Sequence, residues 1–279
     1  MTILKAACVQ LCASRSVDGN IAEAEALIRE AAAGGATYVL TPEQTALMEL
    51  DREVLFASIT RQDDDAGLAR FRALAEELGI WLHIGSLAVL VEPERAANRS
   101  FLIAPDGTIA ARYDKIHMFD VDLPGGERYR ESKTYRAGTD AVVAPMGDIK
   151  VGMSICYDLR FPHLYRALAK AGASLLTVPA AFTKQTGEAH WHILLRARAI
   201  ENGCFVMAAA QGGHHENGRD TFGHSLIIDP WGVVLAEAGT DPCVIHADLD
   251  LDAIAATRGR VPSLSNDRPF EIGDTIASE

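Results

Sequence analysis

The sequence lacks a long apolar run, a secretory leader pattern and a paired set of cysteines. No apolar run approaches the roughly 18 residues of a membrane span. The first ten residues, M-T-I-L-K-A-A-C-V-Q, form a strand pattern without the basic head of a signal peptide. The five cysteines are an odd number with no C-x-x-C pair, which argues against a disulfide framework and a thiolate metal site. We therefore expect a protein that does not associate with membranes and that is located in the reducing cytoplasm.

Positive charge is also scarce, and no composition break divides the chain. Lys and Arg number 26 against 38 Asp and Glu, which gives a formal net charge of -12. The basic residues are scattered, so a nucleic acid or an anionic membrane surface would be a poor partner. Without a Pro/Ser-rich linker we expect a single domain over 1–279, with a core of about 3–258 and a C-terminal arm of about 259–279.

Apolar periodicity alternates between the strand and helix patterns along the chain. This alternation, followed by hairpins, predicts an α/β fold with mixed sheets and helices outside. The long stretch 116–139 has no clear period, and loops of that length are usually functional. We expect helices at 21–33, 66–78 and 188–202, strands at 3–10, 38–41, 80–91, 174–178 and 204–210, and hairpins over 101–113 and 225–237.

Cys156 stands where a buried strand meets a helix. The apolar run 151–155 ends at Cys156, and Pro162 is suited to the first turn of the following helix. Backbone N–H groups and the positive end of a helix at such an elbow favour a thiolate, as a nucleophilic cysteine requires. A buried structural cysteine is the alternative, because free Cys is often buried.

Two further polar residues follow predicted strands. Glu43 comes just after the strand that Pro42 stops, and Lys115 directly follows the hairpin 101–113. A carboxylate beside a thiol can take its proton, and a lysine can stabilise an oxyanion. Spacing alone leaves open a solvated loop glutamate and a surface lysine.

Three ordered motifs resemble those of the nitrilase superfamily, the carbon-nitrogen hydrolases. They are T-P-E-Q at 41–44, Y-D-K-I-H-M-F-D-V-D at 113–122 and S-I-C-Y-D-L-R-F-P at 154–162. The resemblance implies a four-layer α-β-β-α sandwich with two mixed sheets flanked by helices. It also implies a homo-oligomer, a dimer or larger, that needs no cofactor.

Each motif carries one residue of the family's Glu-Lys-Cys triad. The resemblance implies Glu43 as general base and later general acid, Cys156 as nucleophile and Lys115 as the stabilising cation. Glu131, in R-E-S-K, matches a second glutamate beside the lysine. The backbone N–H of Tyr157 would complete the oxyanion hole.

The second half is similar to the omega-amidase and deaminated-glutathione amidase branch, through the segments 171–183, 186–191, 194–201 and 223–232. The motif A-A-A-Q at 208–211, followed by G-G-H-H, favours the deaminated-glutathione amidases within this branch. This resemblance implies a 2-oxoglutaryl amide as substrate. An omega-amidase for 2-oxoglutaramate, succinamate or another linear carboxyamide is the alternative, and a catalytically silent scaffold is a third possibility.

An acyl group with a free carboxylate needs a cation in its pocket, and arginine binds carboxylates bidentately. Arg160 is the candidate, with Phe182 and Thr186 as pocket walls, although Arg160 in an internal salt bridge is the alternative. The sequence departs from the branch at His163 and His192, where glutamate is usual.

The nine histidines do not form a recognised metal motif. His190-x-His192 and His214-His215 lack a third ligand at a known spacing, so we expect no metal. His117, two residues after Lys115, could act as a base for the cysteine, but we favour a structural role in its loop.

Overall fold

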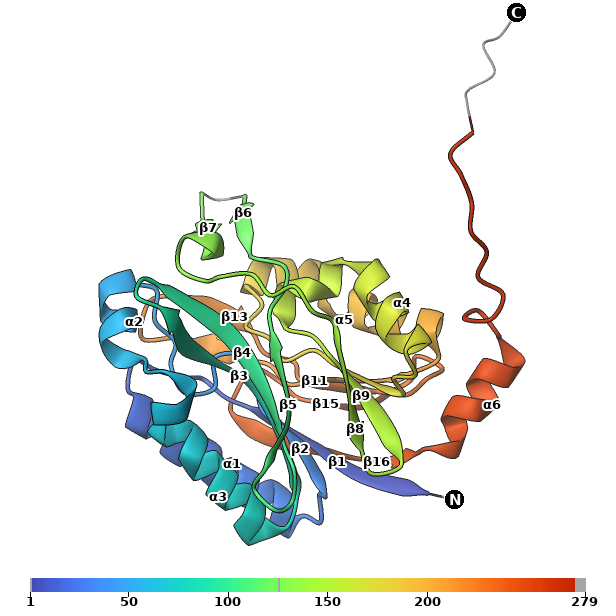
Figure 1. Cartoon of the computed structure of the whole chain (residues 1–279), viewed down its shortest axis with the longest axis horizontal. Helices are drawn as coiled ribbons and strands as arrows, with labels where there is room; N and C mark the ends of the chain where they lie inside the picture. Colours follow the sequence, from blue (N-terminus) through green and yellow to red (C-terminus); the bar gives the residue numbers. More distant parts are fainter. Residues whose placement is uncertain (1, 125, 274–279) are drawn as a thin grey trace, which may run out of the picture.

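Two six-stranded sheets packed face to face form the centre of the computed structural model, which describes residues 2–124 and 126–273 (Figure 1). Each sheet has parallel strands in its middle and antiparallel strands toward its edges, so both are mixed. The first sheet has the order β16-β1-β2-β3-β4-β5, from Cys243–Asp250, Ile3–Gln10, Tyr38–Leu40, Trp81–Glu92, Arg95–Ile103 and Ile109–Asp114.

The second sheet repeats this plan. Its order is β15-β14-β11-β10-β9-β8, from Val234–Glu237, Leu226–Ile228, Phe205–Ala208, Leu175–Thr177, Ile149–Met153 and Val142–Met146. Apolar residues of both sheets, including Cys8 and Tyr38 of the first and Val151 and Leu175 of the second, share one buried cluster. The two sheets therefore enclose a common core.

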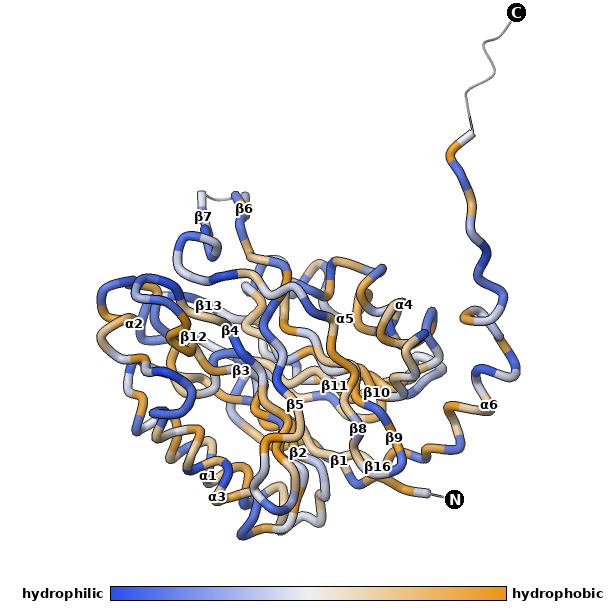
Figure 2. The backbone as a smooth tube through the Cα atoms, in the orientation of Figure 1, coloured by the Kyte–Doolittle hydropathy of each residue, from blue (hydrophilic) through white to orange (hydrophobic). Residues whose placement is uncertain are grey.

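Helices cover the outer face of each sheet. Helices α1 (Val17–Ala33) and α3 (Ala66–Leu78) pack on the first sheet, and α4 (Pro162–Lys170) and α5 (Lys184–Asn202) pack on the second. Apolar segments lie along the strands, and the helices present polar stretches outward (Figure 2). The four-layer α-β-β-α order that the resemblance implied is thus present.

Shorter elements complete the described chain. They are α2 (Arg52–Ser58), α6 (Asp252–Arg260), the hairpins β6–β7 (Asp120–Asp122 and Arg128–Arg130) and β12–β13 (Gly212–His214 and Asp220–Phe222), and the 3₁₀ turns Gln62–Asp64, Glu131–Lys133 and Cys156–Arg160. The stretch 116–139, expected to be a loop, therefore contains the β6–β7 hairpin and one 3₁₀ turn. No helix within 2–124 or 126–273 is long and apolar enough to cross a membrane.

Local signals explain most helix ends. The prediction of 66–78 is confirmed, because Gly79 adopts the left-handed conformation that ends α3. Pro162 opens α4 as expected. The prediction of 21–33 was short by four residues, because Ser16 caps α1 by accepting a hydrogen bond from the Gly19 N–H at 3.3 Å.

The beginning of the C-terminal arm packs on the body, and the rest of its described part extends away from it (Figure 1). The Ser263 hydroxyl donates to the Glu201 carbonyl at 2.8 Å, and Asp267 pairs with Lys170. Phe270 and Ile272 are then 89% and 96% exposed. The remainder of the expected arm, 274–279, lies outside the described residues.

Candidate active site

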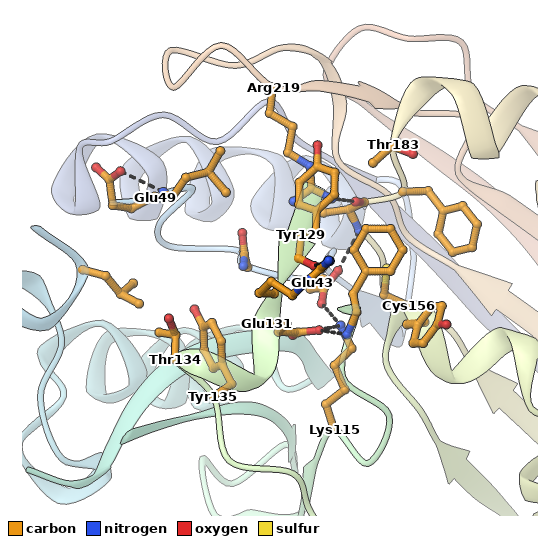
Figure 3. A pocket seen from close by; sticks show the side chains of 18 of the residues that line it. Glu43, Glu49, Lys115, Tyr129, Glu131, Thr134, Tyr135, Cys156, Thr183 and Arg219 are labelled. Carbon is orange, nitrogen blue, oxygen red and sulfur yellow. Dashed lines mark hydrogen bonds and ion pairs between the residues drawn. The ribbon is translucent and has the colours of Figure 1, made fainter. Parts of the chain in front are cut away.

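A cavity of about 250 Å³ lies at the edge where β2, β5 and β9 end. Its wall includes Glu43, Lys115, Glu131 and Cys156 (Figure 3), which come from separate segments of the chain. The strands β2 and β5 run in the same direction, so the residues that follow them meet at one edge. The structure therefore brings together the four residues for which the resemblance implied catalytic roles.

Glu43 is buried and has hydrogen bonds at both carboxylate oxygens. Its Oε1 accepts from Lys115 Nζ at 2.9 Å and from Asn98 Nδ2 at 2.8 Å. Its Oε2 accepts from the Ala181 N–H at 2.9 Å. These contacts orient one carboxylate toward the cavity with little rotational freedom.

Lys115 lies between two carboxylates. Besides Glu43, its Nζ contacts Glu131 Oε1 at 3.0 Å and Oε2 at 2.9 Å. Only 2% of the Lys115 side chain is exposed, against 4% for Glu43 and 11% for Glu131. Lys115 is thus one cation shared by two carboxylates.

The pKa directions define the resting protonation state. Burial would raise the pKa of Glu43, but the charge of Lys115 and its hydrogen bond outweigh burial and lower that pKa. Burial would lower the pKa of Lys115, but Glu131 and Glu43 raise it well above its usual range. Glu43 is therefore ionised at neutral pH, and Lys115 is protonated.

The expectation of a resting thiolate at Cys156 is wrong. Burial, followed by the negative charge of Glu43, raises the pKa of Cys156 well above its ordinary value. The residue opens the 3₁₀ turn Cys156–Arg160 rather than a long helix, and the charge of Lys115, which lowers this pKa, does not offset the two effects. The thiol is neutral at rest and has an ionised carboxylate beside it.

The elbow itself has the geometry that the strand-to-helix pattern suggested. Cys156 has a φ of 49°, in the left-handed region that non-glycine residues rarely adopt. Its N–H donates to the Pro179 carbonyl at 2.9 Å. A strained backbone at a reactive side chain is a common feature of functional sites.

Asp158, which the sequence patterns did not single out, holds this elbow. Its buried carboxylate accepts from the Ile155 N–H at 2.8 Å and from the Tyr113 hydroxyl at 2.7 Å. It also accepts from the His117 N–H at 3.0 Å and contacts His117 Nδ1 at 2.6 Å. The His117 ring stacks on Phe161 at 3.5 Å and does not line the cavity, so its position fits the structural role.

The candidate substrate-binding residues fall into two groups. Tyr157, Phe182 and Thr186 line the cavity, as expected for pocket walls. Arg160 is not among the lining residues; its guanidinium nitrogens lie 3.3 Å from His190 Nδ1, over the rings of Phe182 and Tyr157. Arg160 has no carboxylate partner within the described chain, so the internal salt bridge considered above is not formed there.

Two lining or supporting residues carried no usable sequence signal. Asn98 faces inward from β4 and bridges Glu43 and Glu131, the latter at 3.2 Å. Arg219 reaches the cavity from the segment before β13. An asparagine in a strand and an arginine in a polar loop are common, so no local pattern indicates their role, which depends on tertiary packing.

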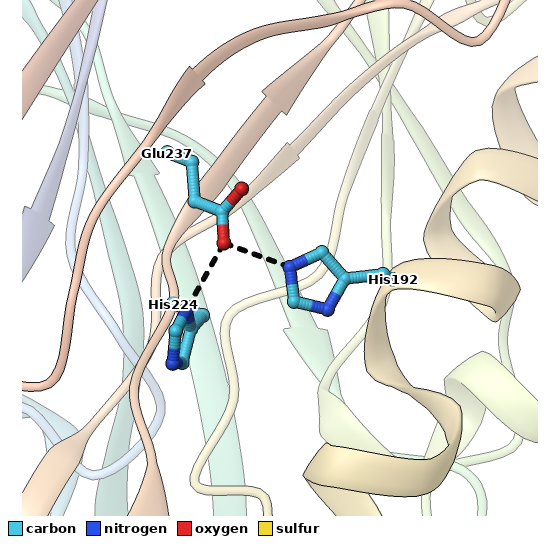
Figure 4. Close-up of side chains that lie close together, drawn as sticks. All are labelled: His192, His224 and Glu237. Carbon is cyan, nitrogen blue, oxygen red and sulfur yellow. Dashed lines mark hydrogen bonds and ion pairs between the residues drawn. The ribbon is translucent and has the colours of Figure 1, made fainter.

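His192, His224 and Glu237 form a group outside the cavity that could hold a metal ion (Figure 4). One Glu237 oxygen contacts His192 Nε2 at 2.8 Å and His224 Nδ1 at 3.0 Å. The three residues come from α5, the segment before β14, and β15, so local spacing could not reveal them. None lines the cavity, and neither does His163, so a metal held here would not touch Cys156.

The profile of the family described as carbon-nitrogen hydrolase matches residues 5–259. A relative named deaminated glutathione amidase, from Yersinia enterocolitica, is 39% identical over 94% of this chain and 92% of its own length.

Solved structures show the same fold. The NitFhit protein of C. elegans superposes with a TM-score of 0.89 at 35% identity, and the match covers 95% of this chain and 65% of that one. A glutamate-to-glutamine mutant of an amidase from Nesterenkonia sp. has a TM-score of 0.80 at 27% identity, covering 95% of this chain and 94% of that one. That amidase carries a covalent acetamide group, derived from fluoroacetamide, at its active-site cysteine.

Proposed function

The chain belongs to the carbon-nitrogen hydrolase family, and from this premise we propose that it hydrolyses deaminated glutathione to 2-oxoglutarate and Cys-Gly. The observation that carries the proposal is the buried Glu43–Lys115 pair beside the neutral thiol of Cys156. The name of the Yersinia relative supports this substrate. A cavity near the lower end of the roughly 300 to 1,000 Å³ usual for ligand sites suits a small molecule.

In the first half-reaction the thiol replaces the amine. Glu43 takes the proton of Cys156 as the sulfur attacks the amide carbon, which forms the carbon–sulfur bond of a tetrahedral intermediate. The carbon–nitrogen bond then breaks, and Glu43 returns the proton to the leaving amine. The acyl group remains on Cys156 as a thioester.

In the second half-reaction water replaces the sulfur. Glu43 takes a proton from water as the oxygen attacks the thioester carbon, and the sulfur leaves with that proton. The products are the free acid and the neutral thiol of the resting state. All steps balance without a cofactor.

The negative charge that develops on the carbonyl oxygen of the tetrahedral intermediate must be stabilised in both half-reactions. We assign this to the Lys115 ammonium, which Glu131 holds beside the cavity, and to the backbone N–H of Tyr157. A fixed cation in a buried site needs no reorganisation as charge develops. Glu131 is thus a positioning residue for Lys115.

The acyl chain is assigned to the walls formed by Tyr157, Phe182 and Thr186. Arg160 remains our candidate for its α-keto carboxylate, because the guanidinium lies over two of these walls and lacks an acidic partner within the described chain. The omega-amidase alternative shares this acyl group and differs in releasing ammonia.

We further propose a single domain, core 3–258, that forms a homodimer. The cluster of apolar residues shared by both sheets supports one domain. An exposed apolar patch of Ile193 and Ile200 on α5 with Trp231 and Val233 in the adjoining turn supports self-association. Five free cysteines fit a reducing cytoplasm.

The test is the release of 2-oxoglutarate from deaminated glutathione by purified protein, with 2-oxoglutaramate assayed in parallel. We expect faster turnover of deaminated glutathione and no turnover by Cys156→Ala. Preferred turnover of 2-oxoglutaramate would support the omega-amidase alternative. A folded wild-type protein that turns over neither would refute both.

A further inference from the structure

Arg219 differs from the other arginines that line the cavity, because it alone has no carboxylate partner within the described residues. Arg52 lies 3.6 Å from Glu94, and Arg128 and Arg130 contact Asp122 at 3.4 Å and 2.8 Å. Within the described residues, the Arg219 guanidinium makes one hydrogen bond, in which its Nη2 donates to the Ala181 carbonyl. Its Nε is buried and has no hydrogen-bond partner.

An unpaired guanidinium nitrogen in a cavity wall has a physical cost. A buried polar group without a partner loses its hydration and gains no hydrogen bond in return, which destabilises the unoccupied site. A carboxylate brought by a ligand would give this lining guanidinium the acidic partner that the described residues do not supply, since arginine binds carboxylates through two parallel hydrogen bonds. The free donor therefore indicates a binding position for an anion.

The guanidinium is held in place before any ligand binds. It lies 5.2 Å from the centre of the Tyr129 ring (Figure 3). The Arg219 N–H donates to Asn217 Oδ1 at 3.0 Å, and the Arg219 carbonyl accepts from the His215 N–H at 2.9 Å. His215, itself buried, contacts Thr221 Oγ1 at 2.6 Å. Such preorganisation lowers the entropy cost of binding.

Ala181 links Arg219 to the Glu43 side of the cavity. The Ala181 N–H donates to Glu43, and its carbonyl accepts from Arg219. In the proposed reaction Glu43 protonates the leaving amine, so the leaving group must face Glu43. Arg219 therefore lies on the leaving-group side, whereas Arg160 packs over Tyr157 and Phe182, which we assigned to the acyl chain.

We propose that Arg219 binds the C-terminal carboxylate of the leaving group. This inference rests on the proposed function and adds a residue that determines specificity. The Cys-Gly of deaminated glutathione ends in a carboxylate, whereas the ammonia released from 2-oxoglutaramate has none. Arg219 thereby selects amides whose leaving group carries an anion a few bonds from the scissile nitrogen.

The test compares three substrates: deaminated glutathione, its analogue with a carboxamide in place of the glycine carboxylate, and 2-oxoglutaramate. For the wild-type protein kcat/KM should fall about 10- to 100-fold from the acid to the carboxamide analogue. Arg219→Gln should lose that preference, with a smaller loss of kcat/KM on 2-oxoglutaramate than on deaminated glutathione. Arg219→Lys should restore part of the preference. Arg29→Gln, at an exposed arginine of α1 outside the cavity, is the control, with the preference unchanged.

Two results would overturn the inference. One is a wild-type protein that hydrolyses the acid and the carboxamide equally well, a comparison that needs no variant. The other is an equal loss on all three substrates in a folded Arg219→Gln protein, because Arg219 would then act only through Glu43. If the folded wild type hydrolyses none of the three, the proposed function fails, and this inference fails with it.

Discussion

At the residue scale, the site depends on charges that set one another's protonation. Glu43 is ionised because the ammonium of Lys115 lies beside its carboxylate, and Cys156 is neutral because burial and the negative charge of Glu43 raise the pKa of its thiol. A proton can therefore move from sulfur to carboxylate only as the sulfur attacks. Catalysis needs no resting thiolate, and an idle Cys156 is protected from nonspecific alkylation and oxidation.

This arrangement predicts a flat pH profile of kcat/KM between about pH 5 and pH 8. The pKa of Glu43 is lowered, so the base stays ionised well below neutrality and activity falls only as pH drops through that lowered value. The pKa values of Cys156 and Lys115 are raised, so neither loses its proton near pH 8. Steady-state rates in constant-ionic-strength buffers would check this, and an inflection between pH 5 and 7 would contradict it.

Replacing Lys115 should lower the stability of the folded protein, because two carboxylates then lack the cation that they share. Lys115→Met leaves Glu43 and Glu131 without a cation, and we expect a loss of about 3 to 5 kcal/mol in unfolding free energy at pH 7. The loss should shrink toward pH 4, because Glu43 without Lys115 can protonate and become neutral in the folded protein. Urea unfolding at both pH values measures it.

Lys150→Met, at an exposed position of β9, is the control and should change stability by less than about 0.5 kcal/mol. An equal loss for Lys115→Met at pH 7 and pH 4 would contradict the electrostatic explanation.

Residues of the site differ in how far the sequence could predict them. Glu43, Lys115 and Cys156 stand in recognisable motifs, and the structure places them together. Asn98 and Arg219 have no local pattern, because their roles arise from strands and loops that meet only in three dimensions. The protonation state of Cys156 was wrongly expected because burial and the nearness of Glu43 are tertiary properties.

At the element scale, close backbone contacts position the turn that carries Glu43. Gly85 lies in β3 where the register to β4 shifts. A Cβ on Gly85 would press on the Thr41 carbonyl and lie 2.5 Å from both the Pro42 oxygen and Pro179 Cβ. Only glycine lets β3 pass this turn so closely.

Gly85→Ala should therefore displace the 41–45 turn and reduce kcat at least about tenfold, with a stability loss of about 1 to 3 kcal/mol from overpacking. Gly259→Ala in α6, where an added Cβ meets nothing within 4 Å, should leave kcat unchanged and should not reduce stability. The measurements are amidase rates and thermal unfolding of both variants. Wild-type kcat in Gly85→Ala would show that this contact does not position Glu43.

Elements with a strong terminal signal were predictable, and those fixed by tertiary contacts were not. Gly79 and Pro162 mark helix ends through their own backbone properties. Each strand of the β6–β7 hairpin within 116–139 is three residues long and has one apolar residue, so its alternation is too short to predict a strand. The strand expected at 151–155 is shifted to Ile149–Met153, since its pairing with β8 and β10 sets the register.

At the scale of the whole molecule, the patch formed by Ile193, Ile200, Trp231 and Val233 predicts a dimer. Each of these residues is at least half exposed, and a Cβ built on Gly232 would meet Ile200, so the turn that carries Trp231 and Val233 lies against α5. The double variant Ile193→Glu/Ile200→Glu should shift the protein to monomers in sedimentation velocity. Val54→Glu on α2 is the control and should not change the oligomeric state. A monomeric wild-type protein would contradict the prediction.

The fold class and the family were accessible from the sequence because three motifs occur in order between residues 41 and 162, and the family match over 5–259 confirms this prediction. The course of the C-terminal arm was not accessible, because a polar segment without periodicity has no preferred docking surface in its own sequence. Its contacts through Ser263 and Asp267 depend on α4 and α5.

The most direct test of nucleophilic catalysis by Cys156 is to trap the acyl-enzyme. Wild-type protein mixed with deaminated glutathione, quenched in acid within one turnover and digested after each lysine and arginine, would be analysed by mass spectrometry. We predict a 2-oxoglutaryl group on peptide 151–160, whose single cysteine is Cys156, and none in Cys156→Ala. Product formation with this peptide unmodified at every quench time, or an adduct at another cysteine, would contradict nucleophilic catalysis by Cys156.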